Sequence, residues 1–334
     1  MTIKDIARES GYSIGTVSRV LNDMPGVSQA AKEAVMEVVD KHHFQLNNNA
    51  KYLKQQSSAG IAVIIKGTQN MLFSALVEPM QALIEKNGYV CAMYYIGEDE
   101  NEVEHALTIC MERRPMGILF LGSNQENFIK DFSRIGVPCV LVTNSAADLK
   151  LKGLSSVSTD DREAARMAVE HLVAMGHREI GVLGGHLSLS YAAKCRYEGV
   201  KDAMTRYKLD FSYDRQYEAS YFSISAGYSA MERLLDKMPQ VTAVFAMSDV
   251  TAIGAMRAIS DRGLKVPEDI SVMGYDGIDI GRYMIPRLTT IRQHREVMAS
   301  RSVEILLDCI EGRSSTVYEV ESFHLVPGES VRPR

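Results

Sequence analysis

Residues 2–23 read TIKDIARESGYSIGTVSRVLND, and this stretch decides the fold of the N-terminal part of the chain. Thr2, followed three residues later by Asp5, is a capping signal that predicts the start of a helix. Gly11 breaks this helix, and Ser13 offers a side-chain oxygen that can cap the backbone N–H groups of a second one. The stretch therefore predicts two short helices joined by a tight turn that contains glycine.

A third helix, capped by Ser28, is expected to support this pair. The apolar face of the second helix points inward at helical spacing and consists of Val17, Val20 and Leu21. Its other side is short and polar, which lets a helix lie deep in the major groove of DNA, and consists of Gly15, Thr16, Ser18 and Arg19. Arg19 can donate two hydrogen bonds to guanine, whereas Ile14 either completes the small core or meets a thymine methyl. The arrangement is the helix-turn-helix plan, with a small bundle that binds nothing as the alternative.

The same stretch resembles the DNA-binding headpiece of the lactose-repressor (LacI/GalR) family of bacterial transcription regulators. The family pattern Thr-x-x-Asp-Ile-Ala, followed by Gly-x-Ser-x-x-Thr-Val-Ser-Arg-x-Leu-Asn, is kept almost in full. The resemblance implies that bases are read by Ile14, Gly15, Thr16 and Arg19. It also implies that Ser13 and Ser18 help to hold phosphates. Gly15 departs from the family, because most relatives carry a longer side chain there.

The next segment resembles the hinge of that family. Residues 44–53 read FQLNNNAKYL, in which Leu46 replaces the usual proline and Lys51 the usual arginine. Three consecutive asparagines are poor helix formers, so this helix is expected to be marginal in the free protein. By resemblance it folds only on DNA, where Lys51 lies in the minor groove and Leu53 of each partner wedges between base pairs. A solvated linker is the alternative.

From Gly60 onwards, short β-branched runs alternate with helical stretches, which predicts parallel sheets with helices on both faces. The expected strands are Ile61–Ile65, Val90–Tyr95, Ile118–Leu121, Val137–Val142, Ile180–Leu183, Ala243–Ala246 and Ile270–Gly274. The expected helices include Glu102–Glu112, Glu163–Met175, Ser225–Lys237 and Thr251–Arg262. Seven or more strand–helix units are too many for one typical sheet. We therefore expect two lobes with a ligand-binding cleft where the strands end.

The family resemblance extends over the whole chain, with landmarks such as GHREIG at residues 176–181 and PRLTTI at residues 286–291. It implies an all-α helix-turn-helix headpiece followed by an α/β, two-lobed effector domain that is similar to a type I periplasmic sugar-binding protein. Three crossings between the lobes are expected, near Ser158, Thr290 and Glu319. The expected organisation is a headpiece over residues 1–44, a hinge over 45–58 and an effector-binding and dimerisation core over 59–334, with an N-terminal lobe of about 59–158 and 291–318 and a C-terminal lobe of about 159–290 and 319–334.

The resemblance also implies an effector site. Arg196 and Asp276 can each take two hydroxyls of a sugar, and both charges are costly to bury unless they are satisfied. Asp249 stands where relatives offer another polar contact, while Phe73 and Phe222 match aromatic positions that stack on a flat ligand face. Leu72 stands where some relatives carry a tyrosine, and Ser190 stands where some carry an arginine that contacts the ligand.

The composition is that of a soluble globular protein and excludes several other classes. The 334 residues are 46% hydrophobic and 24% charged, with a net charge of −5. No apolar run is long enough to span a membrane. The acidic residues in the opening MTIKDIARES argue against an export signal, and five cysteines without a Cys-x-x-Cys pair fit a reducing cytoplasm. No P-loop, zinc-protease or serine-hydrolase motif is present, so we expect neither an enzyme nor a cofactor or metal site.

Together these patterns indicate a cytoplasmic, ligand-responsive transcription regulator that acts as a homodimeric repressor on a palindromic operator. A sugar or sugar derivative is the expected effector. Two alternatives stay open. A solute-binding protein of a transport system would share the two-lobed body, but it would need an export signal and has no use for residues 1–56. An orphan regulator would keep the DNA-binding parts and have no small-molecule effector.

Overall fold

Three helices form the N-terminal unit in the computed structural model, which describes residues 3–21, 25–42 and 60–334. They are α1 (Ile3–Ser10), α2 (Ile14–Leu21) and α3 (Gln29–Lys41). Ser13 and Ser28 cap α2 and α3 as expected: the Ser13 Oγ accepts the Thr16 N–H at 3.1 Å, and the Ser28 Oγ accepts the Ala31 N–H at 3.3 Å. The predicted helix-turn-helix plan is therefore confirmed, while the expected cap at Thr2 lies outside the described residues.

Apolar side chains from all three helices meet in one small core. Ile6, Val17 and Val35 are fully buried there. Outside it, the Glu9 carboxylate accepts hydrogen bonds from Lys41 at 2.8 Å, which ties α1 to the end of α3. Ile14 is 47% exposed and does not belong to this core. Of its two possible roles, filling the core is therefore excluded.

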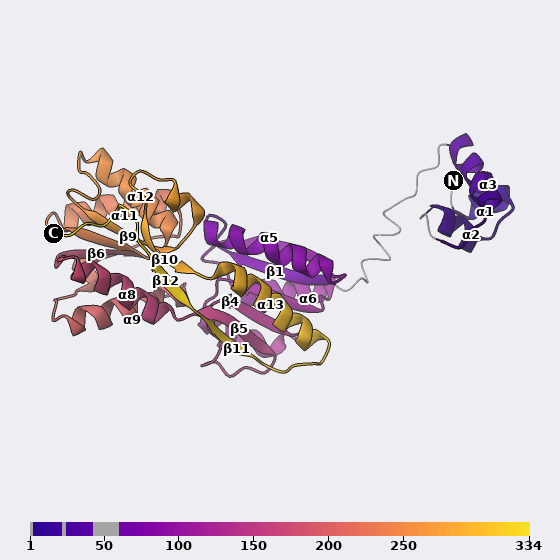
Figure 1. The fold of residues 1–334 in the computed structure, drawn as a ribbon. Helices are drawn as coiled ribbons and strands as arrows, with labels where there is room; N and C mark the ends of the chain where they lie inside the picture. The colour runs from indigo at the N-terminus through magenta and orange to yellow at the C-terminus, as the bar shows by residue number, and fades with distance from the viewer. Residues whose placement is uncertain (1–2, 22–24, 43–59) are drawn as a thin grey trace. The chain divides into compact units, whose positions relative to one another are not determined.

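The C-terminal unit contains two six-stranded sheets, one in each lobe (Figure 1). The first sheet has the strand order β11-β5-β4-β3-β1-β2, and all neighbouring strands in it are parallel. Helices α5 and α13 cover one face, and α6 and α7 cover the other. Its elements are β1 (Gly60–Lys66), α5 (Met71–Lys86), β2 (Val90–Ile96), α6 (Glu102–Arg113), β3 (Gly117–Leu121), α7 (Gln125–Asp131), the 3-10 helix Phe132–Arg134, β4 (Cys139–Thr143), β5 (Leu154–Thr159), α13 (Arg295–Ile310) and β11 (Tyr318–Glu321).

The second sheet has the order β12-β10-β9-β8-β6-β7, in which only the β10–β12 pair is antiparallel. Helices α8 and α9 pack on one face, and α11 and α12 on the other. Its elements are α8 (Asp161–Ala174), β6 (Ile180–Gly184), α9 (Tyr191–Arg206), α10 (Tyr213–Gln216), β7 (Tyr217–Ala219), α11 (Ile224–Lys237), β8 (Ala243–Ala246), α12 (Asp249–Asp261), β9 (Ser271–Asp276), the 3-10 helix Asp279–Arg282, β10 (Thr289–Gln293) and β12 (Phe323–Val326).

The helix pair α11 and α12 packs backbone against backbone. A Cβ added at Gly254, on α12, would lie 2.0 Å from the carbonyl oxygen of Ile224, on α11. No side chain fits in that space, because real Cβ atoms essentially never come so close to another heavy atom. Glycine at this position therefore sets the distance between the two helices.

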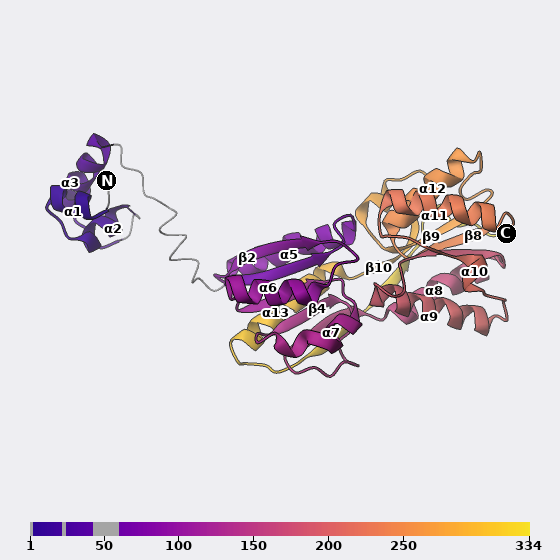
Figure 2. The ribbon, with the colours of Figure 1, turned by 180° about the vertical axis from the view of Figure 1, so that it is seen from behind.

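The chain passes between the lobes three times, after β5 at Thr159, after β10 at Gln293 and after β11 at Glu321. Figures 1 and 2 show the two lobes from opposite sides, joined near β10. The second and third crossings come slightly later than expected from the sequence. The reason is that β10 hydrogen-bonds to β9 and β12 up to Gln293, and β11 pairs with β5 up to Glu321.

All seven expected strands are present, but five observed strands were not among them, namely β5, β7, β10, β11 and β12. β5 reads LSSVST and is buried along its whole length. Its serine hydroxyls accept backbone hydrogen bonds from other segments: the Ser156 Oγ accepts the Ala146 N–H at 3.0 Å, and the Ser155 Oγ accepts the Val317 N–H at 3.0 Å. A buried strand made of hydroxyl side chains lacks the apolar run by which buried strands are found in a sequence.

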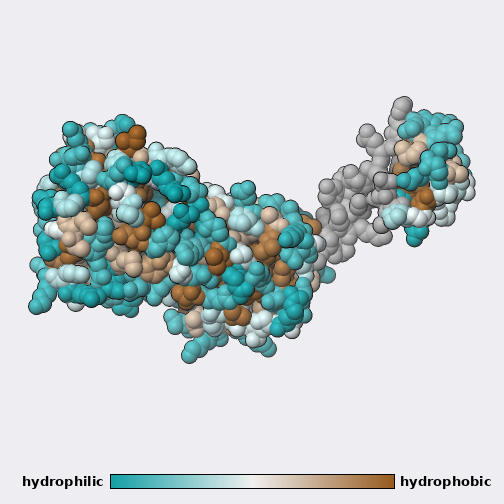
Figure 3. Space-filling model, in the orientation of Figure 1, coloured by the Kyte–Doolittle hydropathy of each residue, from teal (hydrophilic) through white to brown (hydrophobic). Residues whose placement is uncertain are grey.

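The surface of the C-terminal unit is mostly hydrophilic on the face seen in Figure 3, with hydrophobic patches scattered over both lobes. Several large apolar side chains contribute to the exposed surface, among them Tyr283 at 83% and Ile285 at 96% exposure. Within the described residues, no helix combines the length and the apolar character that a membrane span requires.

Candidate functional site

The exposed side of α2 carries the residues that were expected to contact DNA. Val17 and Val20 point into the headpiece core and are buried. On the other side, Ser13, Ile14, Gly15 and Arg19 are exposed, whereas Thr16 and Ser18 are half-buried. The structure thus brings all six predicted contacts together on one helix and its cap.

Ser13 also orients its neighbour, because its Oγ lies 2.9 Å from the Thr16 Oγ1 in addition to capping the Thr16 N–H. A helix N-terminus with free N–H groups favours anions such as phosphate. Lys51 and Leu53 lie outside the described residues, so their expected contacts in the minor groove stay predictions.

Both lobes contribute to a cavity of about 620 Å³, its open mouth included. Five of the expected effector contacts line it, namely Leu72, Phe73, Ser190, Arg196 and Phe222. The first two lie in the first turn of α5, in the N-terminal lobe. The other three belong to the C-terminal lobe, where Ser190 caps α9 and Arg196 lies nearly two turns further along it. The cavity is therefore a cleft between the lobes.

The N-terminal wall of the cleft holds polar residues that the sequence analysis did not single out. Lys66 ends β1, Glu98 follows β2, Ser123 follows β3 and Asn144 follows β4. Carboxyl ends of neighbouring parallel strands meet at one edge of a sheet, and ligands bind there. The polar residues that follow each predicted strand could therefore have been identified from the sequence as candidates for the cleft wall.

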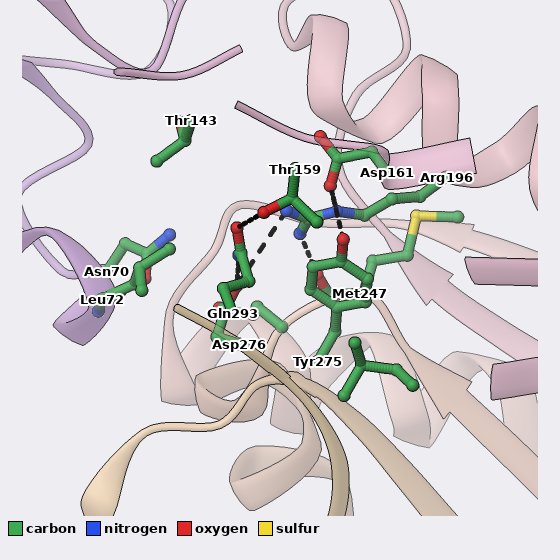
Figure 4. A network of polar contacts seen from close by, with 12 residues as sticks. Asn70, Leu72, Thr143, Thr159, Asp161, Arg196, Met247, Tyr275, Asp276 and Gln293 are labelled. Carbon is green, nitrogen blue, oxygen red and sulfur yellow. Dashed lines mark hydrogen bonds and ion pairs between the residues drawn. The ribbon is translucent and has the colours of Figure 1, made fainter. Parts of the chain in front are cut away.

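Arg196 is buried and held from several sides (Figure 4). Its Nε donates to Asp161 Oδ1 at 2.7 Å, and its Nη1 donates to the Met247 carbonyl. Its Cζ lies 3.7 Å from the centre of the Tyr275 ring, and the Tyr275 hydroxyl donates to the same Asp161 oxygen at 2.7 Å. These partners fix the guanidinium in place at the cleft wall, so it does not form the surface ion pair that a long arginine often makes.

Asp276 is not among the residues that line the cavity. It lies next to Gln293 in the polar network (Figure 4). Its Oδ1 accepts from Gln293 Nε2 at 2.9 Å and lies 3.9 Å from Arg196 Nη2. Its Oδ2 is buried and makes no hydrogen bond of normal geometry within the described part of the chain. Burial raises the pKa of Asp276 to about 7, although the nearby Arg196 charge and the Gln293 hydrogen bond oppose the rise.

Asp249 is not brought to the cleft. It is fully buried at the start of α12, where one oxygen accepts from the Thr290 hydroxyl at 2.6 Å and the other from the Ile278 N–H at 2.8 Å. Burial, together with the nearby Asp276 charge, raises its pKa well above the usual range. These contacts join α12 to β10 and to the turn after β9. In this conformation Asp249 therefore has a structural role.

Strained backbone marks the strand ends at the cleft. Thr143, the last residue of β4, has a φ of 79°, and Asp276, the last residue of β9, has a φ of 114°. Side chains other than glycine rarely adopt such angles, at a cost of about 1–3 kcal/mol each, and they persist mostly at functional sites. The two outliers occupy corresponding places in the two lobes.

A chain of hydrogen bonds runs from the cleft to the crossings between the lobes. The Gln293 amide donates to Asp276, and its Oε1 accepts from the Thr159 hydroxyl at 2.9 Å. Thr159 ends β5 at the first crossing, and Gln293 ends β10 at the second. Gln293 thus ties the Asp276 carboxylate, which lies outside the cavity lining, to two of the three connections between the lobes.

Among the hydrogen bonds that span the cleft from lobe to lobe, two join a loop to a loop. Glu98 Oε1 accepts the Phe222 N–H at 2.9 Å, and Asn124 Nδ2 donates to the Ser188 carbonyl at 3.0 Å. They bridge loops that follow β2 and β3 to loops of the C-terminal lobe. The conformation seen here therefore has the lobes in direct contact.

Two protein-family models match the chain. Residues 2–47 match the bacterial regulatory proteins of the lacI family, and residues 169–331 match a periplasmic binding protein-like domain. The chain is 35% identical over 337 residues to the HTH-type transcriptional regulator MalR of Clostridium butyricum, and the match covers 99% of both chains.

Solved structures of transcription regulators are similar over the whole length. The lac repressor dimer bound to operator and the anti-inducer ONPF has a TM-score of 0.79 at 27% identity, and the match covers 99% of both chains. The complex of the transcriptional regulator CelR with cellobiose has a TM-score of 0.72 at 26% identity, with the same coverage.

Proposed function

Because this chain belongs to the lacI family of bacterial regulatory proteins, we propose that α2 reads an operator and that the cleft binds a sugar or sugar-like effector which controls that binding. The chain is a ligand-responsive, DNA-binding transcription regulator. Repression is the mode that we propose for it. The two units then divide the work between reading DNA and sensing the effector.

On the DNA side, Arg19 makes a bidentate contact with guanine, and Ile14 packs against a thymine methyl. Gly15 and Thr16 lie close to base edges, and Ser13 and Ser18 hold phosphates. Support comes from the exposure of Ile14 and Arg19 on one side of a well-capped helix. Lys51 and Leu53 complete the interface in the minor groove, where Leu53 of each protomer kinks the operator.

Two protomers bind one palindromic operator, because a two-fold protein matches two half-sites related by the same symmetry. The lac repressor structure, which is a dimer on its operator, supports a homodimer for this chain. The domain organisation that we propose remains a headpiece over residues 1–44, a hinge over 45–58 and a two-lobed core over 59–334.

On the effector side, Arg196 takes ligand hydroxyls at the cleft wall, and Phe73 and Phe222 pack on the apolar face of a sugar ring. The free oxygen of Asp276, which does not line the cavity in this conformation, takes ligand hydroxyls when the lobes move apart. Ser190 and Leu72 shape the remaining wall. CelR binds cellobiose and the lac repressor binds ONPF, which supports a glycoside-like ligand here. The cleft works by binding alone, so the protein is not an enzyme and needs no cofactor, and it acts in the cytoplasm.

The single observation that carries the coupling is the hydrogen-bond chain from Asp276 through Gln293 to Thr159. An effector that engages Asp276 changes the geometry of the residue that joins the first two crossings. The lobes then shift relative to each other. Couplings of this kind amount to about 1–3 kcal/mol, which is a change of about 5- to 150-fold in operator affinity.

The test uses the full chain and a random DNA library. Repeated selection on the protein should enrich a palindromic site, and fluorescence anisotropy then gives its dissociation constant with and without neutral mono- and disaccharides. We expect at least one sugar to change that constant by fivefold or more. Failure to enrich a palindrome would refute the DNA-reading proposal. An enriched operator whose affinity no ligand changes would instead identify a regulator without a small-molecule effector.

A further inference from the structure

The cationic side chains at the cleft already have carboxylate partners within the protein. Lys66 Nζ lies 2.7 Å from Glu102 Oε2, and both side chains are almost fully buried. Arg196 Nε lies 2.7 Å from Asp161 Oδ1, again between buried side chains. Because each positive charge is neutralised where it stands, neither is available to balance the charge of an anionic ligand.

Glu98 is a carboxylate at the cleft that lacks such a partner. It lines the cavity from the N-terminal lobe, directly across from Phe222 of the C-terminal lobe. Its Oε1 accepts the Phe222 N–H at 2.9 Å, and it forms no ion pair with any residue that the structure describes. Burial raises the pKa of Glu98 to about 7, against the effects of the Phe222 hydrogen bond and the Lys66 charge.

Above about pH 7, where Glu98 and Asp276 are ionised, negative charge is therefore in excess around the cleft. Glu98 has no positively charged partner among the described residues. Asp276 and Asp161 share Arg196: the Asp276 Oδ1 lies 3.9 Å from the Arg196 Nη2, which is longer than the 2.7 Å between Asp161 Oδ1 and Arg196 Nε. His186 is the remaining titratable side chain of the lining, and its ring lies 5.1 Å from that of Tyr221. A ligand that brings hydroxyl donors fits these surroundings, whereas one that brings further negative charge meets uncompensated carboxylates.

Building on the proposed function, we propose that Glu98 sets the specificity of the cleft: it selects uncharged polyols and rejects their phosphorylated forms. The carboxylate keeps one oxygen, Oε2, for ligand hydroxyls while the other holds Phe222. Above pH 7, where Glu98 is ionised, phosphate oxygens have no proton to donate to it and repel it in a half-buried site where water screens charges weakly. Glu98 is thus a specificity-determining contact that also ties the aromatic residue Phe222 across the cleft.

The variant Glu98→Gln separates charge from shape. An amide oxygen still accepts the Phe222 N–H, so the bridge between the lobes is retained while the negative charge is lost. Asp99→Asn is the matched control, because Asp99 is the next residue in the same loop, is exposed, and does not line the cavity. Circular dichroism and the melting temperature of each variant confirm that it is folded.

The measurement is isothermal titration calorimetry of the full chain at pH 8, where Glu98 is ionised. The probes are glucose, maltose and cellobiose, each paired with its 6-phosphate. In the wild type we expect a neutral sugar to bind at least tenfold more tightly than its phosphate. In Glu98→Gln the neutral sugar should bind more weakly and its phosphate more tightly, so that the ratio of the two constants falls at least tenfold. In Asp99→Asn the ratio should stay at the wild-type value.

Opposite movement of the two constants is a result that a merely structural role of Glu98 does not produce. The proposal is overturned if the phosphate binds as well as the sugar in the wild type, if neither binds, or if the ratio in Glu98→Gln is unchanged. Operator binding of the same preparations is measured in parallel. Its loss would count against the proposed regulatory function, while the ligand preference of the cleft would be judged on its own result.

Discussion

Replacing Asp276 by asparagine tests the electrostatics of the cleft without changing the shape of the side chain. The carboxylate is 1% exposed, and only one of its oxygens makes a hydrogen bond of normal geometry to a described residue. Burial raises its pKa from 3.8 to about 7. Over that interval the folded chain keeps a proton on Asp276 that the unfolded chain has released.

The sign of the effect follows from this difference. The contribution of Asp276 to stability is fully present below about pH 4 and is lost as the pH rises through about 7. The interval spans about 3 pH units, each worth about 1.4 kcal/mol. From pH 4 to pH 8 the unfolding free energy of the wild type should therefore fall by about 4 kcal/mol relative to Asp276→Asn, which stays neutral throughout.

The assay is urea unfolding at four pH values between 4 and 8, followed by circular dichroism because the chain has no tryptophan. Asp210→Asn is the matched control, since Asp210 is exposed and its replacement should leave the pH profile of the wild type unchanged. A wild-type-minus-variant difference that stays constant across the pH range would refute the reasoning, because it would mean that the buried carboxylate is fully compensated.

Three further changes address other parts of the molecule. Gly254→Ala forces a Cβ against the Ile224 carbonyl and should destabilise the C-terminal lobe by about 1–3 kcal/mol, seen as a lower melting temperature in calorimetry. Arg19→Ala removes one base contact and should weaken operator binding by about 1–3 kcal/mol, or about 5- to 150-fold, in anisotropy titrations. Thr159→Val removes the hydrogen bond to Gln293 and should reduce the change in operator affinity caused by effector, while effector-free affinity is kept.

Each of these changes has a matched control. Gly136→Ala should be tolerated, because nothing lies within 4 Å of the added Cβ. Arg8→Ala removes an exposed arginine of α1 that pairs with Asp5, so operator binding should change far less than in Arg19→Ala. Thr108→Val removes an exposed hydroxyl that contacts only its own helix. Equal effects in a variant and its control would contradict the corresponding argument.

The headpiece could be predicted well from the sequence because its signals are local. Ser13 and Ser28 each cap a backbone N–H group three residues downstream, and the apolar spacing around Val17 lies within one helix. The seven strands that were found are short runs rich in β-branched and other apolar residues, whereas the short strands near the crossings, such as β10 and β12, were missed. β5 was not predicted because its buried, hydrogen-bonded serines do not form a pattern of apolar residues.

The cleft was predictable only in part, since its chemistry depends on residues that are distant in sequence. Arg196 was expected to face a ligand, but its partner Asp161 lies 35 residues away and Tyr275 is 114 residues from that partner. Glu98 belongs to the run GEDENE at residues 97–102, which has the composition of a solvated loop. Only the fold shows that this loop turns one of its carboxylates toward the opposite lobe.

The position of Gln293 has a consequence for how such a sensor can change over time. Because one amide contacts both Asp276 and the first crossing, the proposed coupling predicts that a substitution which adapts the cleft to a new compound also changes the resting balance between conformations. Ligand preference and the size of the response are therefore expected to change together. Anyone who redesigns this protein as a biosensor should screen for signal amplitude and ligand preference at once, and should expect that restoring one requires compensating changes at the residues around Thr159.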